Sequence, residues 1–161
     1  MRLKSGNYTV VKGIEFELFE SRYEVPIPDE EKEYSICTYN SSNLSNDFYK
    51  LGNEGKYCKP ILQHEIECAY YVKTKGLING YEVLLICSFI DEVFHYSAFT
   101  DNPKTAIGLN MIEINTSWFT KKIDLNDCTK IWEERIESQF GFRFPTDFER
   151  IIEIELPRKE N

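Results

Sequence analysis

The stretch that decides the fold is Cys68–Thr100, with the sequence CAYYVKTKGLINGYEVLLICSFIDEVFHYSAFT. At its centre, Asn79-Gly80 is the preferred pair for a two-residue type I′ turn, because both central residues of that turn need positive φ. A second two-residue turn at Asp91-Glu92 would complete three antiparallel strands. The stretch therefore predicts a β-meander that forms the central sheet of the protein.

Strand alternation divides the side chains of this meander between two faces. One face is apolar and predicts a core, with Val83, Leu85 and Ala98 among its members. On the other face charged and polar side chains alternate with large apolar ones; they are Lys73, Lys75, Glu82, Ser88 and His95 against Leu84, Ile86 and Phe99. We expect this second face to be partly solvated or partly covered by something else.

The N-terminal part predicts a smaller β unit. Strands are expected at Asn7–Val11 and Ile14–Phe19 around a Lys12-Gly13 turn, and a third at Tyr34–Tyr39. Residues 40–60 are polar and typical of a connector, with a short helix expected at Leu44–Leu51. The chain as a whole, residues 1–161, has the length of a single domain, in which residues 1–40 can form a β subdomain joined by the connector 40–60.

A C-terminal amphipathic helix is expected at Leu125–Ser138. Asp124 is placed to cap its N-terminus. Its apolar residues follow helical spacing and form one stripe, which consists of Leu125, Cys128, Trp132 and Ile136. This stripe would pack Trp132 into the core against the meander. The predicted fold class is therefore α+β, with an antiparallel meander at about 68–100, this C-terminal helix and a small N-terminal β-hairpin unit.

Four shorter elements are expected around the helix. Asn102-Pro103 favours a helix start, because proline is tolerated at the first helical position. Strands follow at Met111–Ile114 and Trp118–Ile123, and Glu149–Leu156 is expected to supply a last strand or short helix.

Charge and composition exclude several classes of protein. The net charge of −8 argues against direct nucleic acid binding, which depends on clustered Lys and Arg. No apolar run approaches the roughly 20 residues that a membrane helix needs. The five cysteines are an odd number without CxxC spacing, so we expect reduced thiols, no disulfide and a cytoplasmic location.

Catalytic and cofactor motifs are not found in the sequence. There is no P-loop, GxGxxG or GxSxG pattern, and no cofactor is expected. The two histidines, His64 and His95, can be built into an active site only with Cys68 or Ser88 as neighbours, and zinc would need a fourth ligand beside Cys58, His64 and Cys68. We therefore assign no catalytic residue and no metal ligand.

Three segments resemble the small acidic immunity proteins that are encoded beside secreted bacterial toxins. They are SGNYTVVKGIEFELFESR (residues 5–22), ECAYYVKTKGLINGYEVLLI (67–86) and CTKIWEERIE (128–137). The resemblance implies a non-catalytic binding protein that neutralises a cognate toxin, such as a basic nuclease domain, by occluding it. Immunity proteins share no catalytic signature, so the resemblance carries over no site residues.

Acidic residues outside the expected core are the candidates for contact with such a partner. They are Asp91 and Glu92 at the second turn and Glu133, Glu134 and Glu137 on the outer side of the expected helix.

Two other functions stay open. One is a small-molecule-binding or regulatory module with a pocket between meander and helix, and the other is an enzyme with an unrecognised site around His95.

Overall fold

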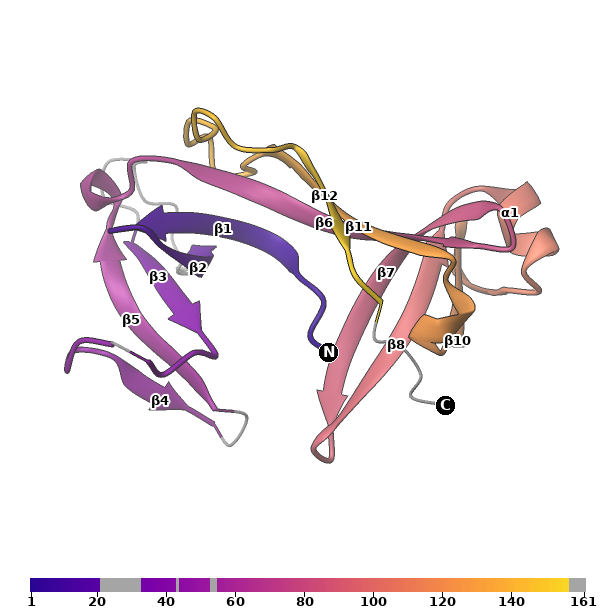
Figure 1. Ribbon diagram of the computed structural model, residues 1–161, viewed down its shortest axis with the longest axis horizontal. Helices are drawn as coiled ribbons and strands as arrows, with labels where there is room; N and C mark the ends of the chain where they lie inside the picture. Colours follow the sequence, from indigo (N-terminus) through magenta and orange to yellow (C-terminus); the bar gives the residue numbers. More distant parts are fainter. Residues whose placement is uncertain (21–32, 43, 53–54, 157–161) are drawn as a thin grey trace. The chain divides into compact units, whose positions relative to one another are not determined.

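The computed structural model describes residues 1–20, 33–42, 44–52 and 55–156 (Figure 1). The chain divides into two compact units. Unit 1 contains residues 1–5, 72–135 and 149–161, and unit 2 contains residues 6–71 and 136–148. The chain therefore passes from one unit to the other four times. Strands β6 and β11 are described with unit 1, which holds most of their residues.

Unit 2 is an antiparallel sheet with the strand order β4-β5-β3-β2-β1. Its elements are β1 (Ser5–Val11), β2 (Ile14–Glu20), β3 (Glu33–Thr38), β4 (Tyr49–Leu51), β5 (Lys56–Leu62) and the 3₁₀ turn η2 (Gln63–Glu65). The hairpin predicted around Lys12-Gly13 is confirmed, because Val11 pairs with Ile14. The expected helix at Leu44–Leu51 is wrong: its last three residues form β4, which pairs with β5.

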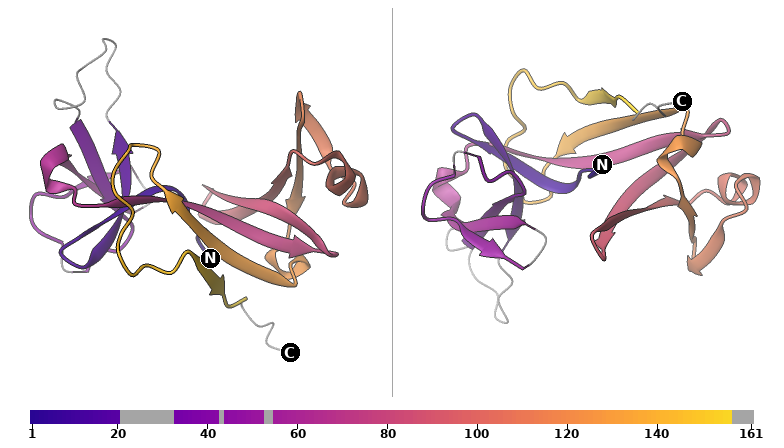
Figure 2. Two further views of the ribbon diagram at one scale, coloured as in Figure 1. Left: turned by 90° about the horizontal axis from the view of Figure 1, so that it is seen from above. Right: turned by 60° about the horizontal axis from the view of Figure 1, so that its bottom comes forward.

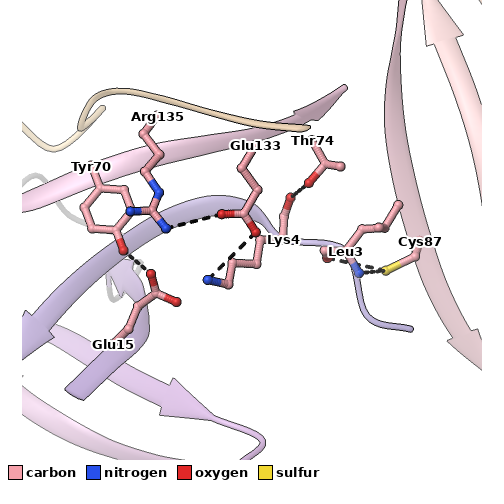
Figure 3. Close-up of polar contacts among 8 residues, drawn as sticks. All are labelled: Leu3, Lys4, Glu15, Tyr70, Thr74, Cys87, Glu133 and Arg135. Carbon is pink, nitrogen blue, oxygen red and sulfur yellow. Dashed lines mark hydrogen bonds and ion pairs between the residues drawn. The ribbon is translucent and has the colours of Figure 1, made fainter. Parts of the chain in front are cut away.

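Aromatic side chains fill the core of unit 2. Tyr34 is buried between Phe140 and Phe142, with ring centroids 5.6 and 5.2 Å away. Tyr70 is fully buried and packs against Phe148, and its hydroxyl donates a hydrogen bond to the Glu15 carboxylate (Figure 3). The late segment 136–148 thus supplies rings that complete a core begun by the early strands.

A disulfide joins Cys37 and Cys58, which face each other across the β3–β5 pair. The expectation that no disulfide supports the fold is therefore wrong. The sequence offered no spacing signal, because the bond depends on a strand register that brings together residues 21 positions apart. Cys68, Cys87 and Cys128 are free thiols.

The strands of unit 1 follow the order β12-β11-β6-β7-β8-β10-β9. Its strands are β6 (Ala69–Ile78), β7 (Tyr81–Ile90), β8 (Val93–Thr100), β9 (Ile112–Asn115), β10 (Trp118–Ile123), β11 (Lys130–Glu137) and β12 (Ile151–Ile154). Both predicted turns of the meander are confirmed, since Ile78 pairs with Tyr81 and Ile90 with Val93. Figure 1 shows β7 and β8 side by side up to their common turn.

The predicted α+β fold class is wrong, because the described chain is mostly antiparallel β-sheet. Within the described residues, helical structure is confined to α1 (Pro103–Gly108), which Asn102 caps as expected, and to short 3₁₀ turns such as η3 (Leu125–Asp127). Asp124 does cap η3, but Cys128 is already extended, and the rest of the expected helix forms strand β11. The capping signal was correct for one turn only.

The core of unit 1 lies on one side of its sheet. It consists of Leu3, Ile78, Val83, Leu85, Ala98, Leu109, Leu125, Cys128 and Ile131. At Gly76 there is no room for a side chain, because a Cβ would lie 2.7 Å from Leu85 and 3.1 Å from the Cys128 sulfur. Trp132 does not belong to this cluster. It follows Ile131 on the strand and therefore points to the opposite side, where it is half-buried.

Candidate binding surface

Asp91 and Glu92 occupy the turn between β7 and β8 and are exposed. Both have positive φ, 50° and 63°, as a type I′ turn requires. The two carboxylates therefore lie where the sequence predicted, at the tip of a hairpin.

Glu133 lies in a different environment from the one predicted. It shares its side of β11 with the core residue Ile131 and is only 7% exposed. Its carboxylate lies 3.8 Å from the Lys4 ammonium and 3.4 Å from the Arg135 guanidinium (Figure 3). The Thr74 hydroxyl also donates to the Lys4 carbonyl, which ties this N-terminal segment to β6. Glu133 is thus part of a buried ion-pair network that holds unit 1 together.

Glu134 and Glu137 lie apart from each other, as strand geometry requires. Glu134 pairs with Lys75 at 2.7 Å, and Lys75 also contacts Glu82 at 2.8 Å. Burial disfavours the charged amine of Lys75, but the two carboxylates outweigh that effect and raise its pKa. Glu137 is exposed at the end of β11 and belongs to unit 2. The three glutamates expected on one helix face therefore do not form one surface.

The side of the unit 1 sheet opposite its core carries exposed apolar side chains, and we call it the outer face. Strand register places Lys75, Leu84, Phe99, Thr120 and Ile112 in one row across β6, β7, β8, β10 and β9. This is the mixed face that the meander predicted, extended by the strands that follow it. The large apolar side chains exposed on it are Ile86, Ile90, Val93, Ile112, Trp118 and Ile151, and Ile114 is exposed at a register shift next to Ile112.

Two groups of these residues stand out on the outer face. At the hairpin tip, Ile90 and Val93 are 53% and 55% exposed and flank the two acidic turn residues. At the β9 end of the sheet, Ile112 is 67% exposed, with Ile114 and Trp118 exposed beside it. Apolar side chains gathered around a small number of charges are typical of protein-binding surfaces.

A shallow hollow lies at the β12 end of the outer face. Its volume is about 460 Å³, and it is lined by Lys75, Leu77, Glu82, Lys130, Trp132, Glu134 and Ile151. Trp132 lies in this hollow because β11 is a strand, which directs alternate residues to opposite faces. A half-buried tryptophan surrounded by ion pairs is a common centre of protein interfaces.

The histidines and free thiols are the residues that the sequence offered for catalysis. His64 and His95 are both exposed, and His95 lies opposite Ser88 on the outer face. Burial raises the pKa of the Cys68 thiol despite the nearby Arg143 guanidinium, and it raises the pKa of Cys128 to about 11. Both thiols therefore stay protonated at neutral pH. No group of three or more His, Cys, Asp or Glu side chains in the described part of the chain could hold a metal ion.

Unit 2 contains a separate hollow of about 570 Å³. It lies beside the β1–β2 turn and is lined in part by Lys12, Glu67, Cys68, Arg143 and Phe148. Both signs of charge and apolar surface meet there, as in many small-molecule sites.

The family model described as Uncharacterised conserved protein UCP033725 matches residues 3–139. The chain belongs to this family. The UCP033725 match includes β1 to β11 and ends before β12. No curated protein and no solved structure matches the chain. Among the described residues, no helix is long and apolar enough to cross a membrane.

Part of the outer face could be found from sequence. The alternation of Leu84 and Ile86 with polar residues indicated a second apolar face, but the contributions of Trp118, Trp132 and Ile151 were missed. Trp132 was assigned to a helix stripe, so its true direction could not be seen. A period-two reading of residues 130–135, in which Ile131, Glu133 and Arg135 share one side, would have placed it correctly.

Proposed function

We propose that this protein is a non-catalytic binding protein that occludes a partner protein through the outer face of unit 1. The observation that carries the proposal is a sheet with a packed core on one side and large apolar side chains exposed on the other. Exposed apolar surface of this extent is costly in water, and burying it contributes roughly 25 cal/mol per Å² to association. A protein surface can cover several strands at once, which a small ligand cannot.

The proposed partner is a basic protein domain. On the outer face of unit 1, Asp91 and Glu92 project between the exposed Ile90 and Val93. Acidic groups beside an apolar patch favour encounter with a positively charged surface and make association fall with salt. The resemblance to immunity proteins supports a cognate bacterial toxin as this partner.

The first test uses the protein encoded beside this chain's gene as the candidate partner. Binding is measured by calorimetry for the wild type and for Ile90→Ser/Val93→Ser, which removes the apolar flanks of the tip. We expect at least a tenfold loss of affinity, because each buried aliphatic side chain contributes about 1.5–3 kcal/mol. Ile14→Ser serves as the matched control, since Ile14 is similarly exposed but lies in unit 2.

A charge reversal, Asp91→Lys/Glu92→Lys, tests the electrostatic contribution to partner binding. We expect slower association and a weaker dependence on salt, with thermal stability nearly unchanged because exposed charges contribute little to folding. Wild-type affinity in both the apolar variant and the charge-reversal variant would contradict the proposal. The toxin assignment fails separately if co-expression of the chain leaves the neighbouring protein's toxicity unchanged.

A cytoplasmic location was inferred from reduced thiols, and the Cys37–Cys58 disulfide weakens that inference. Disulfides persist mainly in oxidising compartments. The proposed binding function does not depend on a cytoplasmic location.

The hollow of unit 2 favours small-molecule binding as a second candidate function. Lys12 and Arg143 can hold an anionic group, while Val10 and Phe148 offer apolar contact. A screen of carboxylates by thermal shift, comparing the wild type with Arg143→Gln, tests this alternative. It is rejected if no carboxylate raises the melting temperature, or if the shift is the same in both proteins.

A further inference from the structure

Strand β12 forms an edge of the unit 1 sheet. It pairs with β11 and with no other strand among the described residues. Both views of Figure 2 show β12, in yellow, beside the orange β11, with no further strand drawn along its other side. Such an edge presents a row of backbone donors and acceptors that another extended chain can use.

The register identifies the residues that offer those groups. The Arg135 amide donates to the Arg150 carbonyl, so this facing pair is hydrogen-bonded. Hydrogen-bonded and non-hydrogen-bonded pairs alternate along an antiparallel ladder. Ile152 lies two positions after Arg150 and opposite Glu133, so it also belongs to a hydrogen-bonded pair. Its backbone groups therefore point to β11. Ile151 and Glu153 direct theirs away from β11, to the unpaired edge.

The side chains of this edge lie beside the hollow that contains Trp132, and Ile151 is part of its lining. Glu153 lies directly opposite Trp132 in the register, and Ile151 lies opposite Glu134. Ile151 lines the hollow and is 65% exposed. One extended segment could therefore form backbone hydrogen bonds with the edge of β12 and place an apolar side chain in the hollow.

Charge at the hollow selects the kind of segment. Lys75 pairs with Glu82 and Glu134, and Lys130 pairs with Glu153 at 2.9 Å. Three carboxylates therefore face two amines, and the side chains of Glu82 and Glu153 are more than half exposed. Each carboxylate can accept several hydrogen bonds. The hollow can consequently receive further Lys or Arg side chains around its apolar centre.

We propose that β12 binds an extended segment of the partner protein as an added antiparallel or parallel strand. An apolar side chain of that segment would lie on Trp132 and Ile151, and Lys or Arg residues two positions before and after it, on the same side of the strand, would contact Glu134 and Glu153. Backbone pairing supplies affinity in this mode and alternate side chains supply specificity. This inference rests on the proposed function and names the way in which the partner is bound.

A second copy of this chain fits the same edge less well. Pairing β12 with itself would bring the Glu153 carboxylates of two copies close to each other. Like charges brought close across paired strands destabilise the pairing. A basic segment has the opposite effect, so charge complementarity selects it over self-association.

The test uses the full chain and a capped synthetic peptide, Thr-Lys-Thr-Phe-Thr-Lys-Thr, as the probe, in which both Lys residues lie two positions from Phe and therefore share its side of the strand. NMR titration follows the Trp132 indole signal and the amides of Ile151–Ile154. We expect the peptide to shift these signals and to slow hydrogen exchange of the Ile151 and Glu153 amides, which gain partners. A peptide with Glu in place of Lys should bind at least tenfold more weakly.

The decisive variant is Glu153→Pro. Proline removes an amide that does not serve the β11 ladder, so β12 stays paired while its outer edge is blocked. Glu153→Gln is the matched control, because it loses the charge but keeps the amide. We expect Glu153→Pro to weaken peptide binding about tenfold and Glu153→Gln about twofold. NMR signals of β11 confirm that the Pro variant is folded.

Three results would overturn the inference. One is a peptide that causes no shift at Trp132 and β12, and another is equal binding by the Pro and Gln variants. The third is light scattering that shows a dimer of the chain alone which Glu153→Pro dissociates, since the occupant would then be a second copy. If the peptide fails to bind while Ile90→Ser/Val93→Ser still weakens partner binding at least tenfold, the proposed function stands and strand addition is wrong.

Discussion

The two units reach stable antiparallel sheets by different means. Unit 2 carries 14 Asp and Glu against 7 Lys and Arg, whereas unit 1 carries 13 against 12. The core of unit 2 is built on aromatic side chains such as Tyr34 and Tyr70 and includes a disulfide. The core of unit 1 is largely aliphatic and includes the free thiol Cys128. The acidity of the whole chain is therefore a property of unit 2.

This difference shows that net charge alone does not identify the binding surface. Unit 1 is nearly neutral, yet it carries the large apolar outer face and the acidic hairpin tip. Many carboxylates of unit 2 are engaged locally, as in the pairs Lys56–Glu17 and Lys59–Asp47. The Lys59 ammonium and the Ser45 hydroxyl lower the pKa of Asp47 to about 2. A contact surface is better recognised from apolar side chains left exposed next to charge.

The largest expected effect concerns the disulfide of unit 2. Cys37→Ala/Cys58→Ala should lower the free energy of unfolding by about 3 kcal/mol, because the bond closes a loop of 21 residues in the unfolded chain. Hydrogen exchange should show the loss in β3 and β5 and little change at β7 and β8. Equal loss of protection in both units would contradict the expectation that the effect is confined to unit 2. Cys87→Ala, a free thiol of unit 1, is the control.

A smaller effect is expected from Cys128 in the core of unit 1. Its folded pKa of about 11 lies above the ordinary 9.0, so the unfolded chain loses the thiol proton first as pH rises. Stability should be constant below pH 9 and fall between pH 9 and 11, by at most about 2.7 kcal/mol. Urea unfolding at several pH values measures this slope. Cys128→Ala should flatten it, and an unchanged slope in that variant would assign the effect to other groups.

The smallest effect concerns the turns. Glu92 has a φ of 63° without being glycine, whereas the equivalent turn of unit 2 has Gly13 with a φ of 78°. Glu92→Gly should therefore stabilise unit 1 by about 1 kcal/mol, and Gly13→Glu should destabilise unit 2 by a similar amount. Thermal unfolding of both variants measures the two changes. A destabilised Glu92→Gly protein would show that the Glu92 side chain contributes to folding.

Local signals explain what the sequence could predict. Asn79-Gly80 and Lys12-Gly13 are strong turn pairs, and each fixes the register of the strands on both sides. Asn102-Pro103 likewise marked the start of α1. The position of Asp91 and Glu92 at an exposed tip followed directly from the strand alternation of the meander.

Pairing between distant strands explains what the sequence could not predict. Strand β11 exists because β6 and β12 pair with it, and strand preference depends on such neighbours more than on the local sequence. Residues 125–138 satisfy a helical spacing, yet Thr129, Ile131 and Ile136 are β-branched and favour a strand once partners are present. The burial of Glu133 and the Cys37–Cys58 bond depend on the same kind of long-range pairing.

The alternation of the chain between its two units has a consequence for synthesis on the ribosome. Tyr34 packs against Phe140 and Phe142, which are made more than about 100 residues later. At roughly 5–20 residues per second, the nascent unit 2 waits on the order of 5–20 s for the rings that complete its core. During that interval the early strands expose apolar surface that is prone to aggregation. A protein truncated before residue 136 would leave unit 2 in that unfinished state permanently.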